Sequence, residues 1–277
     1  MTKAPMKTNH STPAIQSDHF SLEHYAEVLA KAITLGYKFP TVSEMKHGAH
    51  SQGRFLLLRH DIDVAPRYAL RMAQLEHSLG VRSSYFVLLH SLYYNPAAPP
   101  HWEALRQIVS MGFEVGLHYE TDFFEAHGID PLEGVLSDVA ALENILHIKI
   151  ASVSQHRPAS SAFLQKLNEY YVDAYNHDLM HNVRYISDSG FKWRKETPLD
   201  ILGTEERIHA LLHPVTWTFG ELDMAGTYRR ASEEITAEIS ASFEDFISST
   251  NGYLSKREQL DAARKQLYSV PASKCAP

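Results

Sequence analysis

Several apolar segments of the sequence end in polar residues of the types that bind metals or move protons. These residues are His60, Asp61, Asp63, His90, His118, Glu120, Asp122, His156, Arg157, Asp188 and His213. Asp and His without Cys form the usual ligand set of a catalytic Zn²⁺, or of a similar divalent ion that keeps an open coordination position. Two carboxylates at the end of an apolar strand are costly without a cation, so Asp61 and Asp63 indicate a functional site.

Each of these residues also has a structural explanation. Asp61 or Asp63 could cap the helix that follows them in the sequence. A single histidine after a strand more often forms a hydrogen bond than binds a metal. We favour the structural role for His90, which precedes a turn-like loop.

The elements that must position these residues alternate between strands and helices. Residues 55–58 and 84–89 are continuous apolar runs, typical of buried parallel strands, and a helical pattern at 67–79 separates them. Further strand-like runs follow at 113–117, 148–153, 185–188 and 208–212. This alternation predicts a parallel sheet covered by helices, either doubly wound or closed as a barrel. In both folds the reactive groups gather at the carboxyl ends of the strands.

Three regions follow from the composition along the chain. Residues 1–18 are polar and are expected to form a flexible leader. Residues 19–230 contain the alternating pattern and are expected to form the barrel. Residues 231–277 predict two amphipathic helices, broken at Asn251-Gly252, that pack on the barrel or on a partner.

The overall composition excludes several classes of protein. The 277 residues include 17 His and one Cys, and the net charge is −7. A single Cys excludes a disulfide framework and a Cys-based zinc cluster. The negative charge argues against binding to nucleic acid or to an anionic membrane. No apolar run suits a secretory signal or a membrane span, so we expect a cytoplasmic location.

Five short segments carry motifs in a fixed order. They are Leu-Leu-Arg-His-Asp-Ile-Asp at 57–63, Gly-Phe-Glu-Val-Gly-Leu-His at 112–118, Ser-Gln-His-Arg-Pro at 154–158, Tyr-Ile-Ser-Asp-Ser-Gly at 185–190 with Trp193, and Leu-Leu-His-Pro at 211–214. In this order they resemble the motifs of the polysaccharide deacetylases (carbohydrate esterase family four, with the NodB-homology domain), in a divergent Arg-His-Asp-x-Asp form. The resemblance implies a distorted (β/α) barrel, a divalent metal that is usually zinc, and removal of an acetyl group from an N-acetylated sugar.

The resemblance also implies a role for each matching residue. Asp61 matches the general base and Asp63 the metal carboxylate, while His118 matches the first metal-binding histidine. Arg157 matches the arginine that orients the base, and His213 matches the general acid. Because one residue separates the two aspartates, their roles could be exchanged.

The third metal ligand is open because the sequence departs from the family pattern. Asp122 stands where the second motif normally has another histidine. Asp122, Glu120 and His156 are the alternatives. We prefer His156, since imidazole suits zinc and the residue stands at the end of its own strand.

For the substrate, the sequence offers Asp188 and three aromatic residues. Tyr119, Trp193 and Trp217 could form apolar walls that stack on a sugar ring, with core packing about equally expected for the tryptophans. Two further functions stay open. One is a metal-dependent amidase or phosphoesterase acting on a non-sugar substrate, and the other is an inactive glycan-binding or interaction protein. A homo-oligomer is compatible with all of these readings.

Overall fold

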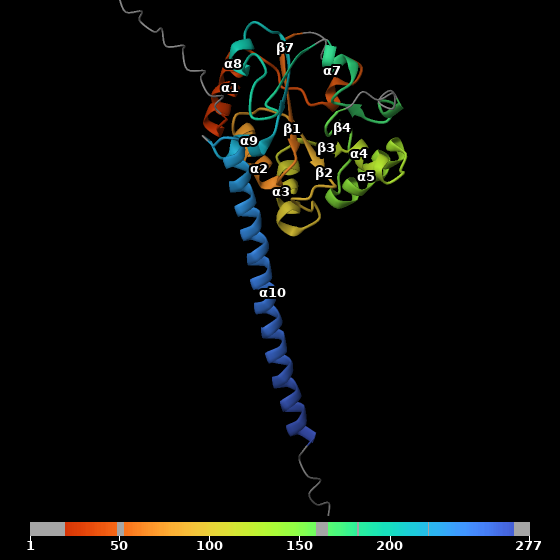
Figure 1. The fold of residues 1–277 in the computed structure, drawn as a ribbon, viewed down its shortest axis with the longest axis vertical. Helices are drawn as coiled ribbons and strands as arrows, with labels where there is room; N and C mark the ends of the chain where they lie inside the picture. Colours follow the sequence, from red (N-terminus) through yellow and green to blue (C-terminus); the bar gives the residue numbers. More distant parts are fainter. Residues whose placement is uncertain (1–19, 49–52, 159–165, 182, 221, 269–277) are drawn as a thin grey trace, which may run out of the picture. The chain divides into compact units, whose positions relative to one another are not determined.

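The computed structural model describes residues 20–48, 53–158, 166–181, 183–220 and 222–268. Within these residues, seven strands form one parallel sheet (Figure 1). They are β1 (Phe55–Ile62), β2 (Ser84–Leu88), β3 (Glu114–Tyr119), β4 (Ser152–Gln155), β5 (Val172–Asp173), β6 (Arg184–Ser187) and β7 (Arg207–Leu212). The strand order is β5-β4-β3-β2-β1-β7-β6. The curled sheet, open between β5 and β6, confirms the predicted distorted (β/α) barrel.

Helices follow most of the strands, as the sequence pattern predicts. They are α1 (Leu22–Thr34), the 3₁₀ helix η1 (Ser43–Gly48), α2 (Pro66–Ser78), α3 (Pro99–Ser110), α4 (Thr121–Ala126), α5 (Pro131–Leu146), α7 (His177–His181), α8 (Pro198–Ile201) and α9 (Pro214–Thr218). Several begin at proline, whose fixed φ suits the first helical turn. The side chain of Ser21 caps α1 by accepting a hydrogen bond from the His24 N–H at 3.1 Å.

The alternation of side chains along β1 decides which residues enter the barrel. All eight residues of β1 are buried. Phe55 and Leu57 pack inside the sheet with Phe86, whereas Leu56 and Leu58 pack against α1 on the other face. Since successive side chains of a strand point to opposite faces, Arg59 and Asp61 continue the inner row.

A glycine lets β3 lie close to its neighbours. A Cβ atom on Gly116 would lie 2.5 Å from a ring carbon of Phe86 and 2.6 Å from the carbonyl oxygen of Ser152. Both distances are shorter than any carbon side chain tolerates. Only glycine fits here, and its absent side chain brings β2, β3 and β4 together beneath the candidate site.

The chain divides into two compact units, Met1–Thr227 and Tyr228–Pro277. The helix α10 (Met224–Tyr268) continues through Asn251 and Gly252, so the predicted break into two helices is wrong. The proposed packing of residues 231–277 on the barrel or on a partner stays a prediction. The predicted leader, residues 1–18, lies outside the described residues. None of the described helices combines the length and apolar composition needed to cross a membrane.

Candidate active site

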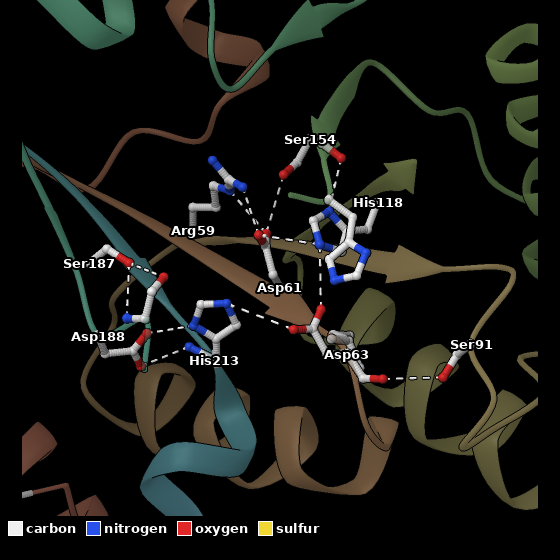
Figure 2. Close-up of polar contacts among 12 residues, drawn as sticks. Arg59, Asp61, Asp63, Ser91, His118, Ser154, Ser187, Asp188 and His213 are labelled. Atoms are coloured by element: carbon white, nitrogen blue, oxygen red, sulfur yellow. Dashed lines mark hydrogen bonds and ion pairs between the residues drawn. The ribbon is translucent and has the colours of Figure 1, made fainter. Parts of the chain in front are cut away.

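Polar side chains from four strand ends meet at one edge of the sheet. Asp61 lies in β1, His118 lies in β3, and His213 follows β7. Figure 2 shows these residues pointing toward one another, with Asp63 between His118 and His213. His156, which follows β4, joins the same group. The prediction that the reactive residues gather at the carboxyl ends of the strands is therefore confirmed for this set.

Asp63, His118 and His156 form a group with the geometry of a metal site. One potential ligand atom from each lies within 4.8 Å of the others. The Nδ1 atom of His118 lies 2.9 Å from the Ser154 carbonyl oxygen, to which it donates. Its Nε2 therefore carries the lone pair and lies 3.4 Å from Asp63 Oδ1. That oxygen is buried and accepts no hydrogen bond from any described residue. An unsatisfied oxygen facing imidazole nitrogens fits a divalent cation such as zinc.

The three alternatives for the third ligand occupy different places. His156 lies with Asp63 and His118 in the group of three potential metal ligands, called the ligand group below. Glu120 accepts a hydrogen bond from His156 Nδ1 at 3.0 Å. Asp122 is exposed in the first turn of α4. The geometry thus favours His156, the ligand preferred from the sequence.

Asp61 is held by Arg59, and not by the predicted Arg157. Arg59 Nε donates to Asp61 Oδ1 at 2.9 Å, and Nη2 donates to Oδ2 at 2.6 Å. Ser154 Oγ lies 3.4 Å from Oδ1. Arg157 is exposed and has a φ of 50° just after β4. The prediction for Arg157 is corrected, because the pleat of β1 puts Arg59 on the same face as Asp61.

The pair with Arg59 sets the charge of Asp61. Burial alone would raise the pKa of the Asp61 carboxyl, but the charge and hydrogen bonds of Arg59 hold this pKa well below its usual range. Arg59 also stacks on Tyr175, with Cζ 4.2 Å from the ring centroid. Asp61 is therefore ionised at neutral pH before any reaction. An arginine directly after the apolar run 55–58, two residues before Asp61, was the sequence signal that could have revealed this partner.

His213 is held by Asp188. Its Nδ1 donates to Asp188 Oδ1 at 2.6 Å, and its backbone N–H donates to Oδ2 at 2.9 Å. The Nε2 atom faces Asp63 Oδ2 at 3.8 Å. Burial would lower the pKa of His213, but the charge and hydrogen bond of Asp188 raise it to about 9. His213 is a protonated donor aimed at the site, and Asp188, predicted to bind substrate, instead positions this donor.

The three aromatic residues predicted to line a sugar site lie in the core. Tyr119 is 1% exposed and donates from its hydroxyl to Asp173 Oδ2 at 2.7 Å. Trp217 and Trp193 are 1% and 8% exposed and pack against Phe20. Trp217 Nε1 also donates to Asp188 Oδ2 at 2.9 Å. The prediction of aromatic walls is wrong for these residues, since their rings stabilise the fold beneath the site.

The side chain of His60 lies on the face of β1 opposite to Asp61. Its Nε2 lies 2.7 Å from Glu76 Oε1, and both side chains are fully buried. Glu76 also accepts hydrogen bonds from Tyr85, Ser83 and Tyr25. This network joins β1 to α1, α2 and β2 directly behind Asp61. It therefore anchors the strand and does not face the ligand group.

The fold and site define a class: a parallel α/β protein with a candidate divalent metal centre at the carboxyl edge of its sheet. No protein-family model matches the sequence, and the comparison with curated proteins found no match. Several solved structures are similar in fold, including three from Bacillus and Streptococcus species. The peptidoglycan deacetylase PdaC of Bacillus subtilis is 14% identical, over 78% of this chain and 98% of that chain, with a TM-score of 0.40.

The second is the deacetylase PplD of Streptococcus pyogenes, in complex with acetate. It is 10% identical, over 66% of this chain and 86% of that chain, with a TM-score of 0.44. The third is a pseudoenzyme of carbohydrate esterase family four from Bacillus anthracis, 12% identical over 70% of this chain and 63% of that chain, with a TM-score of 0.41. At these identities the likeness does not extend to substrate or activity.

Proposed function

We propose that the protein is a metal-dependent hydrolase that removes an acetyl group from an N-acetylated sugar or glycan intermediate. The observation that carries the proposal is the ligand group of Asp63, His118 and His156, flanked by a carboxylate and a protonated histidine. Hydrolysis of an amide needs both a base for the attacking water and an acid for the leaving amine. The five motifs in order favour an acetyl group on a sugar nitrogen.

Asp63 and Asp61 have different roles, metal ligand and proton acceptor, because their hydrogen-bond partners differ. Asp63 Oδ1 has no hydrogen-bond donor among the described residues, so it suits the ligand role. Both oxygens of Asp61 are bound by Arg59, which fixes the carboxylate in one orientation. A divalent ion held by Asp63, His118 and His156 would supply Lewis-acid polarisation of the amide carbonyl and would acidify a water molecule. Asp61 accepts the proton of the attacking water.

His213 acts at the other end of the reaction. An amine anion does not leave at neutral pH, so the amide nitrogen must gain a proton as the C–N bond breaks. His213 is protonated because its pKa is raised to about 9 despite burial, chiefly by Asp188. Its Nε2 faces the ligand group while Nδ1 stays bound to Asp188, so one ring both holds its orientation and donates.

A second candidate is hydrolysis of a simple amide without a sugar ring. The burial of Tyr119, Trp193 and Trp217 favours it, because the residues expected to stack on a sugar lie in the core. Acetate release from N-acetylated amino sugars, compared with ammonia or amine release from simple amides, separates the two. Faster turnover of the simple amides would replace the first candidate by the second.

The metal requirement is tested by elemental analysis of the purified chain. We expect one zinc or similar ion per chain, and loss of both the ion and acetate release in His118→Ala. The matched control is His127→Ala, because His127 is exposed at the end of α4 and bonds only to its own helix. An ion that survives His118→Ala at full stoichiometry would contradict the assigned site.

A further inference from the structure

Glu120 lies where it can hold the third ligand of the candidate metal group. It follows β3 directly, and its Oε1 accepts a hydrogen bond from His156 Nδ1 at 3.0 Å. The His156 backbone N–H donates to the Tyr119 carbonyl oxygen at 2.8 Å. His156 is therefore tied to the end of β3 at two points, through its backbone and through its ring.

The bond to Glu120 decides which nitrogen of His156 is available. An imidazole that donates from Nδ1 keeps its lone pair on Nε2. The same holds for His118, whose Nδ1 donates to the Ser154 carbonyl oxygen. Each histidine of the group thus has one nitrogen anchored to the protein and the other free for the ligand group. The anchor is a backbone carbonyl for His118 and a side-chain carboxylate for His156.

Glu120 is itself held from the far side. His90 Nδ1 lies 3.9 Å from Glu120 Oε2, and His90 Nε2 lies 3.4 Å from Asp138 Oδ2 on α5. The His90 ring stacks on Phe123, with ring centroids 3.8 Å apart. A continuous row of polar groups therefore runs from α5 through His90 and Glu120 to His156. His90 has the structural role predicted for it, because it links Asp138 to Glu120 in this row.

We propose that Glu120 is a positioning residue that fixes the tautomer and orientation of His156, and that His90 and Asp138 hold Glu120 in place. This inference rests on the proposed metal-dependent function. A carboxylate behind a metal-binding imidazole makes the ring more basic and prevents its rotation. Removal of such a partner typically weakens metal affinity by about 10- to 100-fold.

The test is the zinc affinity of the full chain, measured by competition with a chromophoric chelator. Glu120→Ala removes the acceptor, and we expect a roughly 10- to 100-fold weaker affinity. Glu120→Gln keeps an acceptor oxygen without the charge, so its loss is smaller. The control is Glu125→Ala, because Glu125 is exposed on α4, the helix that begins directly after Glu120. Circular dichroism verifies that each variant is folded.

The outcomes separate this inference from the proposed function. If the wild-type chain binds no zinc, the proposed function fails. If the wild-type chain binds zinc, His118→Ala loses it and Glu120→Ala binds as tightly as wild type, only the role of Glu120 is refuted. The Co²⁺ absorption spectrum gives a second readout, since a rotated His156 changes the ligand field in Glu120→Ala but not in Glu125→Ala.

The helix α10 has an exposed apolar face. Ile239, Phe246, Tyr253 and Leu260 repeat every seven residues, and Phe243 lies one turn after Ile239. Each is more than half exposed, from 54% for Ile239 to 68% for Phe246. At 3.6 residues per turn, these side chains share one face of the helix. A single helix cannot cover its own apolar face, and a seven-residue repeat is typical of a helix that pairs with another.

The charges of α10 are divided between its two halves. Residues 231–250 contain five acidic and no basic side chains, whereas residues 251–268 contain four basic and two acidic ones. Two parallel copies would place the acidic halves beside each other. Two antiparallel copies place each acidic half beside a basic half, which is the favourable arrangement.

We infer that α10 pairs with α10 of a second copy of this chain in antiparallel orientation. Light scattering of the full chain is expected to give twice the 31.3 kDa of one chain. Phe246→Asp with Tyr253→Asp places charges in the apolar face and should give the mass of one chain. The control carries Ser248→Asp and Ser255→Asp, which lie about half a turn away, and should keep the double mass.

Charge reversal tests the orientation. Lys256→Glu with Arg257→Glu makes both halves acidic, and Glu244→Lys with Asp245→Lys reduces the acidic excess of the first half from five charges to one. Each variant alone should associate more weakly than wild type, and a mixture of the two should recover the double mass. A wild-type chain that stays single at high concentration refutes the inference. In that case another protein or a lipid surface is the remaining occupant for this face.

Discussion

Replacing Arg59 with methionine tests the buried pair that holds Asp61. Arg59 and Asp61 are 0% and 3% exposed at their side chains and share two hydrogen bonds. Methionine keeps the apolar volume but leaves the Asp61 carboxylate buried without its cation. Removal of one partner of such a pair costs about 3–5 kcal/mol of folding free energy. Since each kcal/mol shifts Tm by about 2–4 °C in a domain of this size, Tm should fall by about 6–20 °C.

The assay is urea and thermal unfolding of five variants beside wild type: Arg59→Met, Asp61→Asn, their combination, and two control variants. Arg82→Met is the control, because Arg82 pairs with Glu44 at 2.7 Å but is 52% exposed, so its loss should cost less than about 1 kcal/mol. Arg157→Met should also cost little. Arg59→Met combined with Asp61→Asn should cost less than the two single changes together. A loss below about 1 kcal/mol for Arg59→Met, or an equal loss for Arg157→Met, would refute the reasoning.

Three further outcomes are expected. Gly116→Ala should lower the free energy of unfolding by about 1–3 kcal/mol in urea, because its Cβ would meet the Ser152 carbonyl oxygen at 2.6 Å; unchanged stability would contradict the close approach. The fully buried His209 has its pKa lowered from 6.5 to about 3 by burial, so it stays neutral when folded and takes a proton when unfolded. Stability should be full above pH 6.5 and fall below it by up to about 1.4 kcal/mol per pH unit, and His209→Leu should flatten that slope. Asp188→Asn should lower the pKa of His213 from about 9, as followed by NMR titration of the ring; an unchanged titration would remove Asp188 from its assigned role.

The sequence predicts the framework well because burial and periodicity are local properties. Continuous apolar runs identify β1, β2 and β3, and their ends carry Asp61, Asp63 and His118. His156 was preferred as third ligand on chemistry and strand position, and the geometry agrees. Such residues are accessible from sequence because parallel strands deliver their carboxyl ends to one place.

Other features depend on packing that no local pattern specifies. Arg59 and Arg157 are both near strand ends in the sequence, and only the pleat of β1 decides which one meets Asp61. From the sequence, Trp193 and Trp217 suit either a sugar-stacking surface or the core. In the structure both rings contact Phe20, so they belong to the core. Asn251-Gly252 favours a turn, but one glycine costs a helix only about 1 kcal/mol, so α10 continues through it.

The position of each strand in the sheet indicates how easily the residues that follow it undergo local unfolding. β1 pairs with β2 and β7 along most of its length, whereas β6 ends the sheet and, among the strands of the described residues, pairs with β7 alone. Strands at the margin of a sheet exchange their amide hydrogens through smaller local openings than central ones. Asp188 follows β6, so a brief opening there releases His213 while Asp63 and His118 stay in place. Under the proposed function, warming would release the proton donor before Asp63 and His118 separate, so a chain that still binds the proposed metal would already be inactive.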